Sequence, residues 1–379
     1  MTKLMVVIHS LRGGGSERVL VNLLKGLDRY KFSIILVLYE RVFDFPLPDN
    51  LEIKILDIYA SKNLFKLAAG FISKIINLTK LIRQNKPDVI FSLLSSTNVT
   101  VILAKLLSRM KCKLIVSEHT HPSVNLNNEV YGGITKGFVK FLYPRADRII
   151  AVSEGIKEDL IKNFNIPEKK ITVIYNPVDI NEIKRFSQED VDHPWFYDEL
   201  PVIVSVGRLT RQKGYPYLIG AFSIVMKSLP CKLLIIGEGE NRGRLVKLAE
   251  ECGLERDIEF LGFQKNPFKY MVNSSVFVLS SLYEGFGNVI VEAMALGLPV
   301  ISTDCPSGPS EIINDKKNGI LVPVKDEKAL ADAILSVLTN SQLKNNLGRE
   351  AKKKAQTFAI NKIVEKYRGI FREDSSSSL

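Results

Sequence analysis

Two glutamates, Glu284 and Glu292, are separated by seven residues that include the glycine-bracketed turn Gly285-Phe286-Gly287. An apolar run typical of a buried strand precedes them, and the turn leads into a segment typical of a helix. On a single helix the two carboxylates would lie roughly 12 Å apart along the axis, and a hydrolytic carboxylate pair needs a separation of about 5 to 9.5 Å. We therefore predict that they anchor two parts of an elongated, hydroxyl-rich ligand.

Two cations follow the first predicted strand of the second half of the chain. Arg208 and Lys213 lie in the segment Gly207-Arg-Leu-Thr-Arg-Gln-Lys-Gly214. The Arg208 guanidinium offers a planar pair of donors to a diphosphate, and Lys213 offers a point charge. Together they would neutralise a departing phosphate group. The alternative is a solvated loop with two ordinary surface cations.

The first predicted strand is followed by the glycine run Gly13–Gly15, which opens a helix. Free amides at such a helix start favour an anion, so Gly15 is a candidate phosphate or acceptor contact. The run lacks the G-x-G-x-x-G spacing of dinucleotide-binding proteins and also fits a plain tight turn. His119 ends a later strand, and we expect it to line the ligand cleft opposite Glu284. His121 follows closely, but no third ligand has sensible spacing, so no metal site is predicted.

Short β-rich runs alternate with helical patterns along the whole chain of 379 residues. This alternation predicts an α/β protein with two doubly wound, Rossmann-like domains that face each other across a cleft. We place the first domain at 1–185 and a polar linker at 186–200. The second domain is predicted at 201–355, and 356–379 is predicted to be a helix that crosses back to the first domain, followed by a tail.

The net charge of +11 arises entirely from residues 1–185, whereas the rest of the chain is balanced. One predicted helix, 62–86, carries an apolar stripe on one side and Lys62, Lys66 and Lys80 on the other. It is either a packing helix with a solvated basic face or an interfacial helix attracted to anionic lipid. Basic and aromatic residues of the same half extend this surface, namely Lys105, Arg109, Lys111, Lys113, Lys136, Lys140 and Arg145, with Phe138, Phe141 and Tyr143 as apolar wedges.

No apolar run approaches the roughly 18 residues that span a bilayer, and the N-terminus does not read as a cleavable signal. The four cysteines are scattered without C-x-x-C spacing, which favours a reducing compartment. We expect a cytoplasmic protein, peripheral on the inner face of the cell membrane. A basic nucleic-acid-binding protein is the alternative from another class, but the chain has no recognised reader motif. A Rossmann dehydrogenase lacks its glycine fingerprint.

Taken together, these segments resemble glycosyltransferase family 4, the retaining enzymes of the GT-B fold, over nearly the whole chain. The E-x7-E motif, Gly207–Gly214, the Gly-Gly-Ser-Glu-Arg turn at 14–18 and Ser-Glu-His at 117–119 carry the resemblance. It implies that Arg208 and Lys213 bind the donor diphosphate, and that Glu284 binds sugar hydroxyls with Gly285, Phe286, Gly287 and Asn288 beside it. It also implies that Glu292 binds the ribose and that the loop after Gly262 and Phe263 binds the base. His119 would lie at the reaction centre, and Gly15 would lie near phosphate or acceptor.

The segment Asp304–Ile312 is similar to that of members that use UDP-galactose or UDP-N-acetylhexosamines on bacterial surface glycans. The resemblance implies transfer from UDP-GalNAc, UDP-GlcNAc or UDP-Gal to a polyprenyl-diphosphate-linked glycan at an anionic membrane surface. The nucleotide sugar is a co-substrate, and neither a cofactor nor a metal is expected. Nucleic acid is not expected as a partner. A soluble transferase that acts on a small acceptor is the alternative within the same chemistry.

Overall fold

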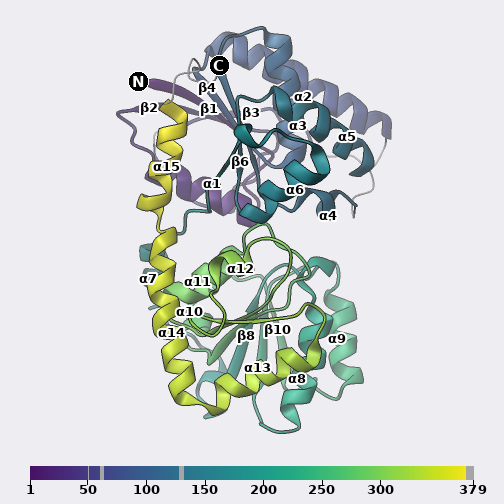
Figure 1. Ribbon diagram of the computed structural model, residues 1–379, viewed down its shortest axis with the longest axis vertical. Coiled ribbons are helices and arrows are strands. Elements are labelled where there is room, and N and C mark those ends of the chain that lie inside the picture. The colour runs from purple at the N-terminus through teal and green to yellow at the C-terminus, as the bar shows by residue number, and fades with distance from the viewer. Residues whose placement is uncertain (50, 60–63, 128–131, 373–379) are drawn as a thin grey trace. The chain divides into compact units, whose positions relative to one another are not determined.

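The computed structural model describes residues 1–49, 51–59, 64–127 and 132–372 (Figure 1). The chain divides into two compact units. Unit 1 comprises Met1–Pro177 and Ile360–Leu379, and unit 2 comprises Val178–Ala359. Each unit is an α/β layer structure with one parallel sheet, as the alternation of strand and helix patterns predicts.

The sheet of unit 1 has the strand order β3-β2-β1-β4-β5-β6-β7, with every neighbouring pair parallel. The central strands are runs of Val, Ile, Leu and Phe that are buried on both faces, which is typical of a parallel sheet covered by helices. The strands are β1 (Thr2–Ile8), β2 (Phe32–Leu38), β3 (Glu52–Ile55), β4 (Val89–Leu93), β5 (Lys113–Glu118), β6 (Arg148–Ala151) and β7 (Ile171–Val173).

Helices cover both faces of this sheet. They are α1 (Gly15–Gly26), α2 (Leu64–Asn85), α3 (Ser95–Ser108), α4 (Pro122–Asn127), α5 (Gly132–Leu142), α6 (Glu154–Phe164) and α15 (Ile360–Arg372). On one face α1 packs against α15, whose Tyr367 and Phe371 join the core formed by β1, β2 and β4. On the other, α2 and α5 both pack against α3. The C-terminal helix is thus part of unit 1.

The sheet of unit 2 has the order β10-β9-β8-β11-β12-β13, again with only parallel pairs. The first three strands in the chain, β8, β9 and β10, lie in order from the middle of the sheet to one edge, and the next strand, β11, lies on the other side of β8. Ligands bind at such a switch point, beyond the carboxyl ends of the strands. The strands are β8 (Val202–Val206), β9 (Lys232–Ile236), β10 (Ile258–Gly262), β11 (Val276–Leu279), β12 (Val300–Thr303) and β13 (Ile320–Val322).

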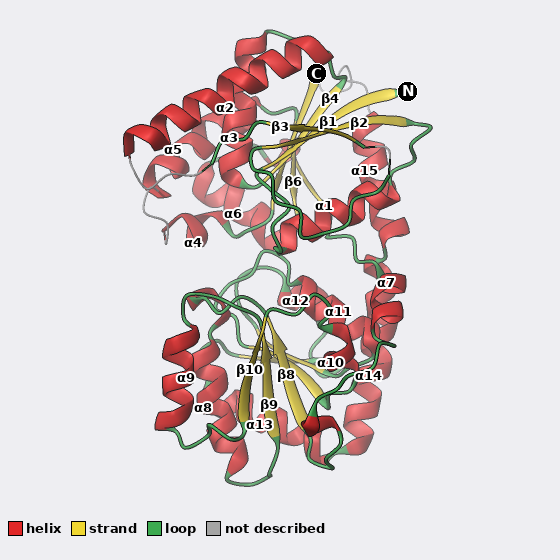
Figure 2. Cartoon of the chain, turned by 180° about the vertical axis from the view of Figure 1, so that it is seen from behind, coloured by secondary structure: helices red, strands yellow, loops and turns green. Residues whose placement is uncertain are grey.

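The helices of unit 2 lie on both sides of its strands (Figure 2). One group, in which α8 contacts both other members, consists of α8 (Tyr215–Met226), α9 (Arg242–Glu251) and α13 (Glu327–Thr339). Another group, whose members all contact α11, consists of α7 (Ile180–Phe186), α10 (Phe268–Val272), α11 (Asn288–Leu296), α12 (Pro309–Ile312) and α14 (Ser341–Ala355).

The boundary between the units differs from the one set by composition. The first domain was predicted to reach residue 185, followed by a linker at 186–200, but unit 2 begins at Val178. The polar segment belongs to unit 2 because it makes specific contacts there. Asn266 Nδ2 donates to the Phe186 carbonyl at 2.8 Å, and His193 Nε2 lies 3.1 Å from Glu259 Oε2. Polar residues thus mark packed structure here rather than a free connection.

Candidate active site

Lys213 and Glu284 form a buried ion pair in unit 2. Lys213 Nζ lies 2.6 Å from Glu284 Oε1, and the two side chains are only 13% and 8% exposed. The residues come from the loops that follow β8 and β11, which are neighbouring parallel strands. Because the carboxyl ends of parallel strands meet at one edge of the sheet, two groups 71 positions apart in the chain are brought together there.

The loops after β8 and β11 are also joined through their main chains. Leu282 N donates to the Gln212 carbonyl at 2.7 Å, and Gln212 Nε2 donates to the Tyr283 carbonyl at 2.9 Å. Gly214, at φ 61°, lets the backbone pass close to Ser280, because a Cβ at this position would collide with the Ser280 carbonyl oxygen. The position of Lys213 is therefore fixed by backbone as well as by its ion pair.

A third loop, after β12, holds Glu284 from the other side. Ser307 Oγ donates to the Glu284 carbonyl at 2.7 Å, and Glu284 N donates to the Pro306 carbonyl at 3.3 Å. Ser281 Oγ donates to Glu284 Oε1 at 2.6 Å, while the Ser281 carbonyl accepts from Thr303 Oγ1 at 2.6 Å. The carboxylate, its main chain and the residue that orients it are thus all hydrogen-bonded.

The supporting residues Ser281, Thr303 and Ser307 are not among the residues predicted from the sequence. Ser281 directly follows Ser280 at the end of the apolar run of β11. Two hydroxyl residues at the carboxyl end of a buried strand were a signal available in the sequence.

Arg208 and Glu292 are the other charged residues of the predicted set in unit 2. Arg208 is exposed in the loop after β8, and none of the described residues forms an ion pair or side-chain hydrogen bond with its guanidinium. Glu292 lies on α11 and is 6% exposed. Glu284 precedes the helix, so the two carboxylates do not share one helix and do not form a hydrolytic pair through it.

The residues of the turn between Glu284 and Glu292 have different roles. Gly287 has φ 95° and precedes Asn288, the first residue of α11, so the left-handed conformation at the helix start requires glycine. Phe286 is buried, and its ring packs edge-on against Phe358 at 5.3 Å between centroids. Its side chain thus belongs to the buried interior of unit 2.

The predicted base-binding loop begins at the end of β10. Gly262 has φ 77°, and a Cβ there would lie 2.9 Å from Glu238 Oε1. The next residue, Phe263, is 56% exposed. Gly262 thus permits close approach of the Glu238 carboxylate. The exposed ring of Phe263 is consistent with stacking of a planar base.

The glycine turn of unit 1 is shaped by its own glutamate. Gly15 is the first residue of α1, and Ser16 Oγ donates to Glu17 Oε2 at 2.7 Å. The Glu17 carboxylate lies where a Cβ of Gly14 would be. A carboxylate in the first turn stabilises the positive end of the helix dipole. The anion expected at this helix start is therefore supplied by the chain itself, and phosphate would have to share the site with Glu17.

His119 directly follows β5 in unit 1. Its Nε2 lies 2.9 Å from Ser117 Oγ, and its Nδ1 is buried without a hydrogen-bond partner among the described residues. Burial lowers the pKa of His119 to about 3. The imidazole is therefore neutral near pH 7, so it can exchange hydrogen bonds but does not supply a positive charge. The predicted site residues divide between the units, with His119 and Gly15 in unit 1 and the others in unit 2.

A buried carboxyl beside His119 was not predicted. Glu118 accepts hydrogen bonds from Ser95 Oγ at 2.9 Å, Tyr143 Oη at 2.7 Å and Thr120 Oγ1 at 3.2 Å. Burial raises the pKa of Glu118, and the three hydroxyls counteract this by stabilising the charged form. These bonds tie the end of β5 to Ser95, the first residue of α3, and to Tyr143, which follows α5, and thereby fix the strand end that precedes His119.

Two residues of the predicted basic surface are internal. Tyr143, expected to be a wedge, is fully buried because its hydroxyl bonds Glu118 and Asn98. Lys113 is also buried, and its Nζ donates to the Ile370 carbonyl at 2.7 Å, which ties β5 to the end of α15. Lys62 lies outside the described residues.

The apolar stripe predicted for α2 is buried only towards the C-terminal end of the helix, and Ala68 of the stripe is exposed. Ile75, Leu78 and Ile82 of the predicted apolar stripe are buried, whereas Lys66 and Lys80 are exposed. Within the described parts of the chain, no helix is long and apolar enough to cross a membrane. Over the same residues, no group of three or more His, Cys, Asp or Glu side chains is arranged to hold a metal ion.

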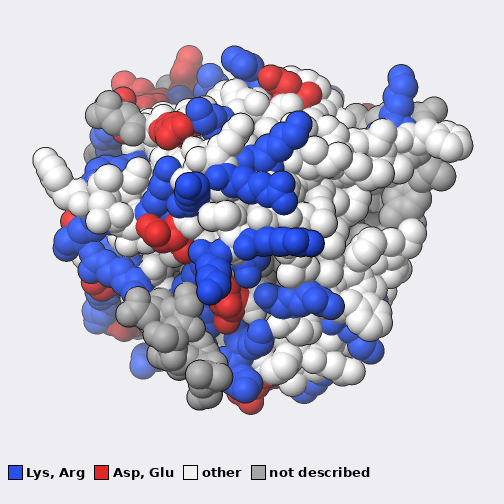
Figure 3. All heavy atoms as spheres, turned by 90° about the horizontal axis from the view of Figure 1, so that it is seen from above, with Lys and Arg blue, Asp and Glu red and all other residues white. Residues whose placement is uncertain are grey.

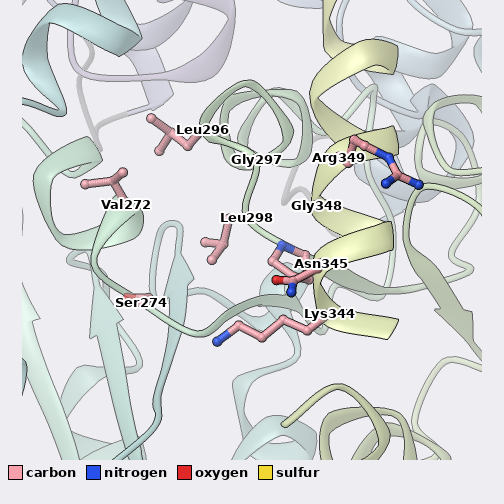
Figure 4. Close-up of a pocket in the computed structure, with 10 residues that line it drawn as sticks. Val272, Ser274, Leu296, Gly297, Leu298, Lys344, Asn345, Gly348 and Arg349 are labelled. Carbon is pink, nitrogen blue, oxygen red and sulfur yellow. The ribbon is translucent and has the colours of Figure 1, made fainter. Parts of the chain in front are cut away.

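A cavity of about 180 Å³ lies elsewhere in unit 2 (Figure 4). Leu296 and Leu298 line one side, and Lys344 and Asn345 of α14 line the other. None of the predicted site residues borders this cavity. It therefore does not form part of the candidate site.

Comparison with known proteins agrees with this geometry. The family model for glycosyl transferases group 1 matches residues 187–354, and that for glycosyltransferase family 4 matches residues 13–182. The chain is 34% identical over 368 residues to an N-acetylgalactosamine-N,N'-diacetylbacillosaminyl-diphospho-undecaprenol 4-alpha-N-acetylgalactosaminyltransferase of Campylobacter jejuni, covering 96% of this chain and 98% of that protein. It is 26% identical to an amylovoran biosynthesis glycosyltransferase of Erwinia amylovora, covering 98% and 99%.

Among solved structures, that of Anabaena HepE in complex with UDP and glucose has a TM-score of 0.80 at 20% identity, with 100% of each chain covered. Sucrose-phosphate synthase from Thermosynechococcus elongatus has a TM-score of 0.83 at 18% identity, with 98% of each chain covered. These likenesses establish the fold of the two parallel sheets as GT-B. With the family models and the near-full-length relative, they show that the chain is a glycosyltransferase and belongs to glycosyltransferase family 4.

Proposed function

We propose that this glycosyltransferase moves a sugar, with retention, from UDP-GalNAc, UDP-GlcNAc or UDP-Gal to a hydroxyl of a polyprenyl-diphosphate-linked glycan at a membrane surface. The observation that carries the proposal is the joined set of loops around Lys213 and Glu284 in a chain 34% identical to a transferase named for an undecaprenol-diphosphate acceptor. UDP is present in the HepE structure with the same fold, which supports a UDP-linked donor.

The chemistry assigned to unit 2 is electrostatic. Arg208 and Lys213 would stabilise the charge that develops on the departing diphosphate, in the place where other enzymes use a divalent cation. This makes the reaction metal-independent. Glu284 is poorly suited to be the attacking nucleophile, because its Oε1 already accepts from both Lys213 and Ser281. We assign it to sugar hydroxyls, which can donate to the carboxylate, and we assign Glu292 to the ribose.

His119 would contribute a neutral hydrogen-bonding group at the reaction centre. Its low pKa keeps it from acting as a proton donor near pH 7. The acceptor proton then goes to the leaving phosphate, whose oxygen gains basicity as the bond to the sugar breaks. Binding and orientation of the two substrates supply the remaining rate enhancement.

The membrane part of the proposal rests on unit 1. The outer side of α2 presents Phe65, Ile72 and Ile76, which are 87%, 56% and 48% exposed. At about 100° per residue these three positions fall within roughly 40° of one another around the helix. Lys66 and Lys80 lie beside them and are exposed. Exposed apolar residues with lysines beside them are typical of helices that lie in a membrane interface.

The same character continues on the neighbouring helices. Phe141 and Ile134 of α5 are 73% and 63% exposed, and Leu107 of α3 is 56% exposed. Phe71 of α2 stacks on Phe138 of α5 at 6.3 Å between ring centroids, so the two helices share one surface. Lys and Arg outnumber Asp and Glu on the face shown in Figure 3. Apolar insertion and attraction to anionic lipid would act together here.

The test is release of UDP from each UDP-sugar in the presence of an undecaprenyl-diphosphate-linked glycan and a chelator. We expect turnover with one UDP-sugar and loss of turnover in Arg208→Met. Turnover only with added divalent metal would contradict the assignment of the charge to Arg208 and Lys213. Turnover with small glycosides but none with the lipid-linked glycan would overturn the acceptor.

A further inference from the structure

We propose that Glu284 competes with the nucleotide diphosphate for Lys213 and thereby lowers the affinity of the enzyme for its UDP product. This inference rests on the proposed function, since it assigns a second role to a residue of the donor site. In the first role the carboxylate accepts hydrogen bonds from the sugar. In the second it replaces the diphosphate on Lys213 when the nucleotide leaves.

The competition follows from contacts within unit 2. Lys213 Nζ is 2.6 Å from Glu284 Oε1, and Ser281 Oγ donates to the same oxygen at 2.6 Å. Ser281 is fully buried, and its carbonyl is held by Thr303 Oγ1. The carboxylate is thus fixed on the ammonium by a hydroxyl that is itself fixed.

A diphosphate on Lys213 must approach this carboxylate. The Lys213 ammonium has three donors, so it can contact both anions, but the two anions then lie close together. Their repulsion is little screened because the side chains of the pair are only 13% and 8% exposed. Glu284 therefore disfavours the binding of a nucleoside diphosphate that carries no sugar.

An intact donor offsets this repulsion and the product does not. Glu284 Oε2 takes part in neither the Lys213 bond nor the Ser281 bond. A sugar hydroxyl can donate to it, which stabilises the carboxylate beside the diphosphate. After transfer the sugar is gone and the diphosphate has gained charge, so the repulsion rises at the moment when release is required. Glu284 thus favours the UDP-sugar over UDP.

Glu292 provides a matched comparison within the same motif. Both glutamates are buried, and for each 6% of the whole residue is exposed. Glu292 lies on α11 and forms no ion pair with Lys213, whose partner is Glu284. Under the proposed function its carboxylate accepts from the ribose hydroxyls, which UDP retains. Neutralising the two carboxylates should therefore change UDP affinity in opposite directions.

The experiment measures the affinity for UDP by titration calorimetry in the full-length protein. We expect Glu284→Gln to bind UDP about five- to tenfold more tightly, from loss of one buried like charge, and to bind the preferred UDP-sugar no more tightly than the unchanged enzyme. Glu292→Gln should bind UDP more weakly.

Failure of the inference is distinct from failure of the proposed function. If the unchanged protein binds neither UDP nor any UDP-sugar, the proposed function is wrong. If it binds UDP and Glu284→Gln binds UDP equally well or more weakly, the competition is wrong and Glu284 only supports the site.

A second variant covers the case in which Glu284→Gln does not fold, as judged by its thermal unfolding. Ser281→Ala removes the hydroxyl that holds the carboxylate on Lys213 but keeps the charge. We expect a smaller increase in UDP affinity, about twofold, because the charged carboxylate remains near Lys213. Ser302→Ala removes another buried hydroxyl, which bonds the Thr303 carbonyl, and should leave UDP affinity unchanged. Equal or weaker UDP binding in Ser281→Ala than in Ser302→Ala would overturn the inference.

Discussion

Ser307 Oγ donates a hydrogen bond to the main-chain carbonyl of Glu284 at 2.7 Å. Ser307 has φ 58°, in the left-handed region, and the adjacent Gly308 has φ 93°. Left-handed conformations of residues other than glycine cost about 1 to 3 kcal/mol and persist only where the surroundings hold them. The backbone of Ser307 is thus held in a strained conformation beside its hydrogen bond to Glu284.

Ser307→Ala should reduce donor binding more than stability. The variant keeps the strained backbone but loses the bond to Glu284, so we expect the KM for the UDP-sugar to rise about fivefold, in line with about 1 kcal/mol for one hydrogen bond. Ser310→Ala changes an exposed serine of the same segment and should have no effect. Steady-state kinetics and thermal unfolding of both variants check this. An unchanged KM in Ser307→Ala would show that the bond does not position Glu284.

Gly214→Ala should damage the site, whereas Gly253→Ala should not. The two glycines have similar φ angles, 61° and 68°, so both substitutions carry the same conformational cost of about 1 kcal/mol. A Cβ at Gly214 would collide with the Ser280 carbonyl, whereas one at Gly253 has no atom within 4 Å. We expect Gly214→Ala alone to lose UDP binding and to unfold at a clearly lower temperature. Equal unfolding temperatures of the two variants would mean that the close approach of the loops is not required.

His119 should make the protein less stable in mild acid. Its pKa is lowered from 6.5 to about 3 by burial, so below pH 6.5 the unfolded chain binds a proton that the folded chain does not. This contribution to stability is complete above pH 6.5 and is lost as the pH falls toward 3, by up to about 1.4 kcal/mol per pH unit. In His119→Asn the free energy of unfolding should fall less between pH 7.5 and pH 5. Urea titrations of both proteins at several pH values give these free energies. If the prediction is wrong, the free energy of unfolding will depend on pH equally in His119→Asn and in the unchanged protein.

Phe141→Ser should weaken binding to vesicles. Phe141 lies on the surface shared by α2 and α5 and is 73% exposed, so its removal lowers the apolar area available for insertion. Tyr197→Ser is the control, because Tyr197 of unit 2 is equally exposed at 73%. In co-sedimentation with anionic vesicles we expect a several-fold loss of binding for Phe141→Ser only, most visible at high salt, where charge attraction is screened. Equal binding by both variants, or none by the unchanged protein, would remove the membrane assignment.

The sequence by itself determined the two parallel sheets, the motif residues and the family. Runs such as Leu4–Ile8 and Val276–Leu279 are continuous apolar segments, and such strands are stable only with helices on both faces. The positions of Arg208, Lys213 and Glu284 at strand ends then follow from local pattern. The pairing of Lys213 with Glu284 depends on which strands are neighbours, and β8 and β11 meet only in the folded sheet.

Only the tertiary structure decided how each polar group is used. Tyr143 and Lys113 read as surface residues, but each is buried because a partner distant in the chain, Glu118 or the Ile370 carbonyl, satisfies its polar end. The segment at 186–200 read as a linker because local composition does not record contacts such as that of Asn266 with Phe186. Burial and hydrogen bonding are set by residues far away in the chain, and the spacing of neighbouring residues carries no record of them.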